Sequence, residues 1–80
     1  MAWTVYILEC ADKTLYTGIT KDLERRFTAH MNGSGAKYTR GRIPLKILYT
    51  ELRRTKGQAL KREAEIKSLN RAEKLRLALS

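Results

Sequence analysis

Three side chains at one predicted strand–helix junction have the types and the spacing of a phosphate-binding site. Tyr16 stands in a short predicted strand, and Arg26 and His30 stand in the helix predicted to follow it. Because Arg26 and His30 are four residues apart, they lie one above the other on one helix face. A phenol, a guanidinium and an imidazole that converge there predict a site for a phosphate group. For His30, a capping or half-buried structural role is the alternative.

Glu63 is the other chemically informative residue, in a later helix predicted to run to Leu69. Stepping that helix at roughly 100° per residue places Glu63 near the middle of an apolar arc and Glu65 on the opposite, polar arc. A carboxylate that faces inward is unfavourable unless it is paired or binds a metal. From the residues alone, an ion pair with Arg26 or Lys67 is the favoured interpretation, and a metal ligand is the alternative.

The elements that position these residues are predicted to form one small α+β domain over residues 1–80. Segments rich in β-branched and aromatic residues are predicted to be strands: residues 3–10, 15–19 and 45–52. Capping signals and helical periodicity predict helices over about residues 22–31, 55–69 and 70–79. The order strand, strand, helix, strand, helix, helix predicts a three-stranded mixed or antiparallel sheet flanked by helices. The imperfect alternation of the third strand is typical of a strand buried on both faces.

The first two strands are expected to form a hairpin that brings two tyrosines together. Alternation along the first strand places Tyr6 on the opposite face from Val5 and Ile7. Tyr6 is then expected to meet Tyr16 across the hairpin or close to it. Taken alone, two facing tyrosines indicate packing more often than chemistry.

The charge of the chain indicates a polyanionic partner. Lys and Arg number 17 against 8 Asp and Glu, a formal charge of +9 in 80 residues. On so small a chain this excess favours nucleic acid over a membrane surface. Basic clusters with one aromatic residue are predicted to follow a nucleic-acid backbone, with solvated loops as the alternative: Lys37, Tyr38, Arg40 and Arg42, then Arg53, Arg54 and Lys56.

Cysteine usage and hydropathy exclude several other classes. Cys10 is the only cysteine, so an intramolecular disulfide or a cysteine-based zinc site is excluded. This usage fits a reducing, cytoplasmic location. Neither a signal peptide nor a membrane span is expected, because no apolar stretch has the required length.

Two tripeptides in the predicted hairpin resemble the motif of the GIY-YIG nucleases. Residues 16–18, Tyr-Thr-Gly, stand where that family has Tyr-Ile-Gly, and residues 4–6, Thr-Val-Tyr, stand where it has Gly-Ile-Tyr. Arg26 stands at the position of the family's helix arginine, and His30 follows as in several subgroups. Residues 59–63 resemble the helix that carries the family's metal-binding glutamate. The resemblance covers almost the whole chain and is to small, single-domain bacterial members of uncharacterised function.

Two departures from the family motif concern backbone or packing positions. Thr4 replaces the first glycine, and Thr17 replaces the isoleucine. Neither position carries the chemistry, so the resemblance still implies the GIY-YIG endonuclease fold.

The resemblance also implies a metal-dependent DNA endonuclease or nickase and roles for five residues. Tyr6 is then the general base, Arg26 clamps a phosphate oxygen, and Tyr16 positions water or phosphate. His30 orients Tyr6 or contacts phosphate, and Glu63 binds Mg²⁺ or Mn²⁺, cations that share one carboxylate with water and substrate oxygens. Since a phenol has a pKa near 10, nearby positive charge is expected to favour the phenolate of Tyr6.

The reaction implied by this resemblance cuts P–O3′ and leaves a 5′-phosphate and a 3′-hydroxyl. Branched or single-stranded DNA is the substrate expected, with specificity supplied by the domain itself or by a protein partner. The alternative function is a DNA- or RNA-binding module that keeps the fold without catalysis. A protein-interaction adapter is a third interpretation, and it predicts no salt-sensitive DNA binding.

Overall fold

A computed structural model of the chain describes residues 2–11, 13–31 and 44–79, apart from the side chains of residues 30, 31, 44 and 45. The described residues form strands and helices in the predicted order: β1 (Trp3–Cys10), β2 (Leu15–Thr20), α1 (Leu23–Met31), β3 (Pro44–Arg53), α2 (Lys56–Lys67) and α3 (Arg71–Leu79). The predicted α+β class is confirmed. Helix α2 ends two residues earlier than predicted, because Ser68 caps it and its hydroxyl donates to the Glu65 carbonyl at 2.6 Å.

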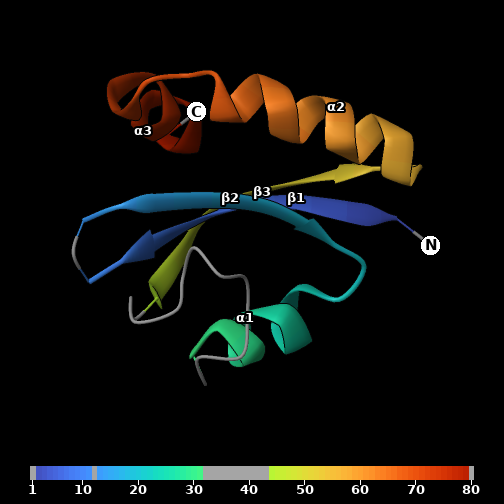
Figure 1. The fold of residues 1–80 in the computed structure, drawn as a ribbon, viewed down its shortest axis with the longest axis horizontal. Helices are drawn as coiled ribbons and strands as arrows, with labels where there is room; N and C mark the ends of the chain where they lie inside the picture. Colours follow the sequence, from blue (N-terminus) through green and yellow to red (C-terminus); the bar gives the residue numbers. More distant parts are fainter. Residues whose placement is uncertain (1, 12, 32–43, 80) are drawn as a thin grey trace.

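The three strands form an antiparallel sheet in the order β2-β1-β3. Helices α2 and α3 cover one face of this sheet, and α1 covers the other, which gives three layers (Figure 1). The site described below lies along β2, the edge strand between the two helical layers.

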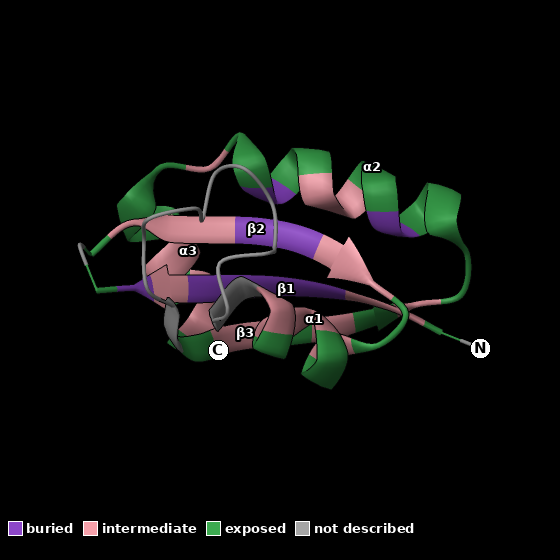
Figure 2. Cartoon of the chain, turned by 60° about the horizontal axis from the view of Figure 1, so that its bottom comes forward, coloured by how far each residue is buried: buried purple, intermediate pink, exposed green. Residues whose placement is uncertain are grey.

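The expectation that the third strand is buried on both faces is wrong. The central strand is β1, whose residues Val5 to Leu8 are almost completely buried (Figure 2). The edge strand β3 leaves Lys46 and Thr50 exposed. Its imperfect alternation has another cause: Ile7 pairs with Tyr49 and Leu8 with Ile47, so a β-bulge shifts the register between them.

Side-chain caps begin the two C-terminal helices. Thr55 Oγ1 accepts the Gln58 backbone N–H at 3.1 Å, whereas Gln58 Oε1 accepts from Arg54 rather than from the cap residue. The predicted second capping box is complete, because Asn70 and Glu73 exchange side-chain-to-backbone hydrogen bonds of 2.9 Å. These caps set where α2 starts and therefore which of its residues face the sheet.

The hydrophobic core lies between the sheet and α2. Val5 and Ile7 of β1 pack against Ala59 and Ile66 of α2, and all four are fully buried. Partly buried side chains surround this cluster: Trp3, Leu15, Ile19, Leu48, Tyr49 and Leu77. Burial of this apolar surface holds α2 against the sheet.

A polar network also anchors α2 to β3. The Tyr49 hydroxyl donates to Glu51 Oε2 at 2.8 Å, and Arg62 Nε donates to Glu51 Oε1 at 2.5 Å. Arg53 lies 3.3 Å from the same carboxylate oxygen. Burial disfavours the charge on Glu51, but the Tyr49 and Arg62 hydrogen bonds outweigh it, so the pKa of Glu51 lies below its ordinary value. This network fixes the rotation of α2 and, with it, the direction of Glu63.

Candidate active site

The β1–β2 hairpin places the two motif tyrosines next to each other. Tyr6 pairs with Gly18, and Leu8 pairs with Tyr16. The two tyrosine rings therefore lie diagonally across the ladder, with centroids 6.2 Å apart and ring planes inclined by 42°. A Cβ at Gly18 would lie 2.6 Å from the Tyr6 hydroxyl oxygen and 3.1 Å from Cε1 of Tyr16. The missing side chain at Gly18 is what gives the tyrosine pair its space.

Helix α1 brings Arg26 to the tyrosine pair from the other helical layer. Asp22 caps this helix, because its Oδ1 accepts the Arg25 backbone N–H at 3.1 Å. The Arg26 side chain hydrogen-bonds to both Tyr6 and Tyr16. Arg26 Nε is buried and has no hydrogen-bond partner among the described residues. Arg26 therefore meets both phenols at the strand–helix junction, where the sequence analysis expected it beside Tyr16.

The protonation of Tyr6 differs from the expectation. Burial raises the pKa of Tyr6 to about 12, and the hydrogen bond and positive charge of Arg26 only partly oppose this shift. Tyr6 is only 1% exposed, and the negative charge of the Glu63 carboxylate also disfavours its phenolate. Tyr6 is therefore a neutral phenol at pH 7 in the protein without substrate.

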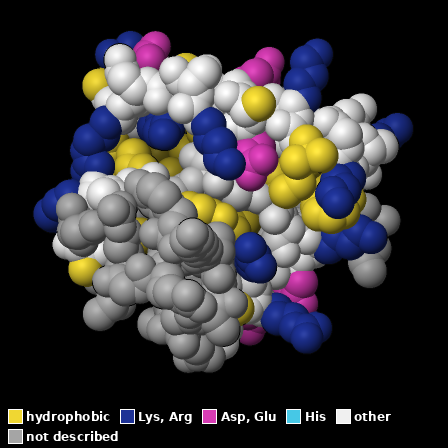
Figure 3. Space-filling view, viewed as in Figure 1, with side chains coloured by type: hydrophobic (Ala, Val, Ile, Leu, Met, Phe, Trp, Pro, Cys, Tyr) yellow, Lys and Arg dark blue, Asp and Glu magenta, His cyan; other side chains and the backbone are white. Residues whose placement is uncertain are grey.

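Glu63 reaches the same region from α2, on the opposite face of the sheet. The Glu63 side chain is 18% exposed and that of Glu65 is 55% exposed, so helical geometry separates the two as predicted. Glu63, Tyr16 and Arg26 line one groove of about 530 Å³ that crosses the edge of β2, together with Trp3, Gly18, Ile19, Thr20, Lys21, Lys56 and Leu60. On the face of the molecule that Figure 3 shows, acidic, basic and hydrophobic side chains lie close together. The groove thus joins functional groups from β2, α1 and α2.

Comparison with known proteins identifies the family. The GIY-YIG catalytic domain matches residues 2–76. This chain belongs to the GIY-YIG family. A UPF0213 protein of Natronomonas pharaonis is 58% identical over 73 residues, which are 91% of this chain and 86% of that protein. A UPF0213 protein of Staphylococcus saprophyticus is 52% identical over 73 residues, 91% of this chain and 89% of that protein. These names specify no activity.

Two solved structures of similar proteins share the fold. The solution NMR structure of a UPF0213 protein from Bacillus halodurans matches with a TM-score of 0.59 and 47% identity, covering 96% of this chain and 82% of that one. That of a protein from E. faecalis matches with a TM-score of 0.66 and 39% identity, with the same coverage. No helix in the described part of the chain is long and apolar enough to cross a membrane.

The Glu63 carboxylate is partly occupied by an ion pair, one of the two interpretations considered for it. Lys67 Nζ lies 3.5 Å from Glu63 Oε2, and the Lys67 side chain is 55% exposed. An i,i+4 pair whose lysine is so exposed contributes little to stability, because the ammonium group exchanges easily with solvent. The carboxylate therefore remains accessible to a cation in the groove.

The donors near Glu63 fit a hard divalent cation better than zinc. Among residues 2–11, 13–31 and 44–79, no three His, Cys, Asp or Glu side chains cluster. The groove is also lined by the hydroxyl-bearing residues Tyr16 and Thr20, although the Thr20 hydroxyl already hydrogen-bonds to the backbone of Asp22. A single carboxylate with oxygen neighbours suits Mg²⁺ or Mn²⁺, which keep several waters and take their remaining ligands from substrate. In a GIY-YIG protein, Glu63 would hold such an ion.

Of the predicted nucleic-acid-binding residues that the structure describes, one lines the groove and two lie outside it. Lys56 lines the groove, whereas Arg53 pairs with Glu51 and Arg54 is exposed outside it. The remaining predicted contacts and the side chain of His30 lie outside the described residues: Lys37, Tyr38, Arg40 and Arg42. All of these stay predictions.

Sequence reasoning missed part of the groove. Trp3, Lys21 and Leu60 line it beside the predicted residues. Trp3 shares the sheet face of Val5, so its contact with the core was foreseeable from alternation. The contact of Trp3 with Lys21 and Lys56 could not be foreseen, because it depends on both the strand register and the position of α2.

Proposed function

We propose that this chain is a Mg²⁺- or Mn²⁺-dependent DNA endonuclease or nickase that acts in the cytoplasm. The observation that carries the proposal is the groove at the β2 edge, where Tyr16, Arg26 and Glu63 meet from three different elements. Tyr6 lies directly behind this groove, over Gly18. A phenol pair, a guanidinium and a carboxylate supply the parts that phosphodiester hydrolysis needs.

Arg26 is the residue that clamps the reacting phosphate. Its planar fork can donate two hydrogen bonds to non-bridging oxygens as their charge grows in the transition state. A buried donor without an acceptor is unfavourable, and Arg26 Nε has none among the described residues. An arriving phosphate would satisfy the guanidinium. Tyr16, which lines the groove and is bonded to Arg26, orients water or phosphate through its hydroxyl.

Glu63 holds the divalent cation, which when bound supplies positive charge to the phosphate and to the leaving oxygen. A carboxylate at this point would otherwise repel the phosphates that the surrounding lysines attract. Lys67 pairs with the Glu63 carboxylate in the protein alone, and it would be released into solvent on cation binding. This exchange explains why an inward carboxylate is tolerated here.

Tyr6 accepts the proton of the attacking water. The water oxygen forms a bond to phosphorus and its proton passes to the Tyr6 phenolate. The P–O3′ bond breaks at the same time, and the leaving O3′ takes a proton from solvent, which leaves a 5′-phosphate and a 3′-hydroxyl. Because the pKa of Tyr6 is about 12 without substrate, the phenolate is scarce at neutral pH. The reaction is therefore slow at pH 7 and accelerates as the pH rises.

A nucleic-acid-binding module without catalysis is the competing function, and the +9 charge supports it equally. The position of Glu63 argues against it, because a pure binder gains nothing from a carboxylate inside its phosphate groove. The deciding experiment is cleavage of end-labelled single strands, forked DNA and supercoiled plasmid with Mg²⁺ or Mn²⁺. We expect cuts with 5′-phosphate ends that EDTA abolishes. Salt-sensitive binding to all substrates without any cut would establish the binding module instead.

A further inference from the structure

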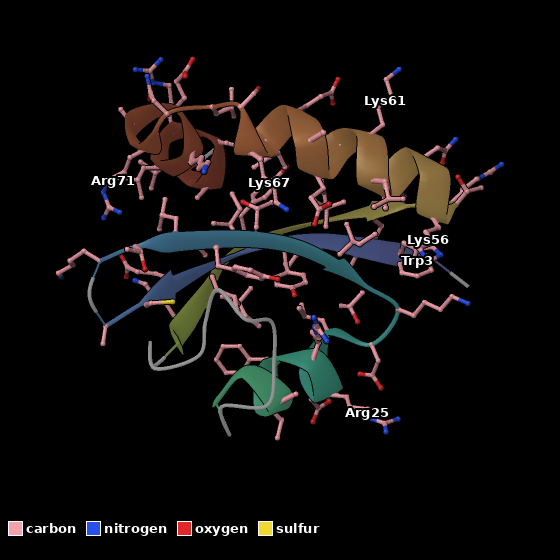
Figure 4. All side chains as sticks on the ribbon, in the orientation of Figure 1. Trp3, Arg25, Lys56, Lys61, Lys67 and Arg71 are labelled. Atoms are coloured by element: carbon pink, nitrogen blue, oxygen red, sulfur yellow. The ribbon has the colours of Figure 1, made fainter. Side chains whose placement is uncertain are left out.

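One end of the groove has a chemistry that phosphate hydrolysis does not require. Trp3 lies there with Lys21 Nζ 5.3 Å and Lys56 Nζ 5.7 Å from its ring centroid. Leu60, which is 45% exposed and lies one helical turn after Lys56, also lines the groove, as does Ile19. Figure 4 shows Lys56 beside Trp3 under the start of α2, whereas Lys61 on the same helix points away. We call Trp3, Lys21, Lys56 and Leu60 the tryptophan end of the groove.

The two lysines at the tryptophan end are available to a ligand. Both are exposed, and among the described residues neither ammonium group lies within ion-pairing distance of a carboxylate. They lie over the π-face of Trp3, a contact that is weak at exposed sites. An aromatic ring between unpaired cations, with an exposed leucine beside it, matches a nucleotide: the base stacks on the ring and the lysines contact its phosphates.

A continuous duplex does not use such a surface. Its bases are stacked inside the helix, so it offers phosphates to the lysines but no π-face to Trp3. An unpaired base has an open face, and stacking on an aromatic side chain is tolerant of sequence. The tryptophan end and the reacting groups Tyr16, Arg26 and Glu63 line the same groove, whose volume of about 530 Å³ lies in the range of small-ligand pockets.

We propose that Trp3 stacks on an unpaired base next to the phosphate that is cut, so that the DNA must be single-stranded at that nucleotide. This inference rests on the proposed nuclease function and specifies its substrate. Lys21 and Lys56 turn from the ring to the flanking phosphates when the base arrives. The competing interpretation is that Trp3 only packs against the core and the lysines only cover its edge.

The test uses the intrinsic fluorescence of Trp3, the only tryptophan of the chain. The full chain is titrated in EDTA with a decathymidylate, with the same strand carrying abasic sites, and with a blunt hairpin duplex. Anisotropy of a label on each DNA reports binding independently. We expect strong quenching by the thymidylate and little by the abasic strand or the duplex at equal occupancy. Equal quenching by all three, or binding of the thymidylate without quenching, would overturn the proposal.

Variants give a second measurement that does not depend on fluorescence. Trp3→Phe should keep its affinity for the thymidylate within a few-fold. Trp3→Leu should lose about 5-fold to about 150-fold, the range for removing one base–aromatic contact, with duplex affinity unchanged. Because Trp3→Leu removes core packing, folding is checked by circular dichroism. If it does not fold, Leu60→Asn replaces it, since Leu60 is exposed and its loss should weaken only single-strand binding.

The outcomes separate this inference from the nuclease proposal. Quenching that depends on the base, without cleavage under any condition, would support the stacking site and refute the nuclease. Cleavage of continuous duplex at the same rate as single strands, with no effect of Trp3→Leu on either, would refute the stacking site and leave the nuclease intact.

Discussion

Gly18 lies directly opposite Tyr6 in the β1–β2 ladder, and a Cβ at Gly18 would come within 2.6 Å of the Tyr6 hydroxyl oxygen and 2.8 Å of Cζ. The ring of Tyr6 therefore occupies the space where the side chain of residue 18 would stand. This contact links the two halves of the GIY-YIG motif: the tyrosine of one strand needs the glycine of its neighbour. If Gly18 served only to relieve backbone strain in a turn, it would not need to lie opposite Tyr6.

Replacing Gly18 with Ala should displace the Tyr6 ring and disturb its hydrogen bond to Arg26. We expect cleavage to fall at least about tenfold and stability to fall by about 1–3 kcal/mol, as in overpacked cores. Gly57→Ala is the control, because a Cβ there would meet only Thr55 Oγ1, at 4.0 Å. That variant should be neutral or stabilised by up to about 1 kcal/mol. Normal cleavage by Gly18→Ala would show that the Tyr6 hydroxyl position is unimportant.

Arg26→Lys tests whether the guanidinium fork is needed. Lysine keeps the charge but cannot bridge Tyr6 and Tyr16 while also donating twice to a phosphate. We expect folding and most DNA affinity to be retained and the cleavage rate constant to fall about 100-fold or more. Arg25→Lys, the neighbouring residue that points into solvent in Figure 4, should cleave like the wild type. Wild-type cleavage by Arg26→Lys would reduce Arg26 to a steering charge.

The raised pKa of Tyr6 predicts how cleavage depends on pH. If the phenolate is the base and its pKa is about 12, its population grows about tenfold per pH unit below that value. Single-turnover cleavage should therefore rise with a slope near one between about pH 7 and pH 9. Tyr6→Phe should lose both the rate and the slope. A wild-type rate that is flat over this range would mean that Tyr6 acts as a neutral hydrogen-bond donor.

The Glu51 network predicts how stability depends on pH. Because the pKa of Glu51 is lower in the folded protein than in the unfolded chain, its contribution is present above the unfolded value. That contribution is lost as the pH falls through the folded value. Arg62→Met removes the main partner of Glu51, whose side chain is 15% exposed, and should destabilise the fold by about 2 kcal/mol. Because the pKa of Glu51 then lies closer to its unfolded value, this variant should lose less stability between neutral and acid pH than the wild type.

Lys61→Met is the control for that stability measurement. Lys61 is the exposed neighbour of Arg62, and no carboxylate pairs with it in the described part of the chain. It should change stability by less than about 0.5 kcal/mol. Chemical denaturation of both variants between pH 3 and pH 7 compares them. An unchanged acid profile in Arg62→Met would show that Arg62 does not hold the ionised Glu51.

Short sequence patterns predicted several features of this structure. Alternation in β1 predicted that Tyr6 and Tyr16 meet, because the side-chain period of a strand is a local property. Helical geometry likewise separated Glu63 from Glu65. The capping signal at Asn70 gave the start of α3, since the partner Glu73 lies only three residues away.

Properties that depend on distant segments could not be read in this way. β1 is central because it pairs with both β2 and β3. The sequence of β3 wrongly suggested that β3 was the strand buried on both faces. Arg26 lowers the pKa of Tyr6, as expected of a nearby positive charge, but burial raises it by more, and the burial of one side chain depends on the whole fold. The tryptophan end joins β1, the start of α1 and α2, and no spacing along the chain indicates it.

The central claim is that Glu63 serves a cation and not the fold, and Glu63→Gln measured beside Glu65→Gln tests it most directly. Cleavage with Mg²⁺ and thermal melting are followed for both variants. Since Lys67 is exposed, its release should leave the melting temperature of Glu63→Gln within a few degrees of wild type. We predict that Glu63→Gln binds DNA at least as well as wild type but does not cut it, while Glu65→Gln cuts normally. A clear loss of stability in Glu63→Gln, with normal cleavage by its folded fraction, would contradict the account.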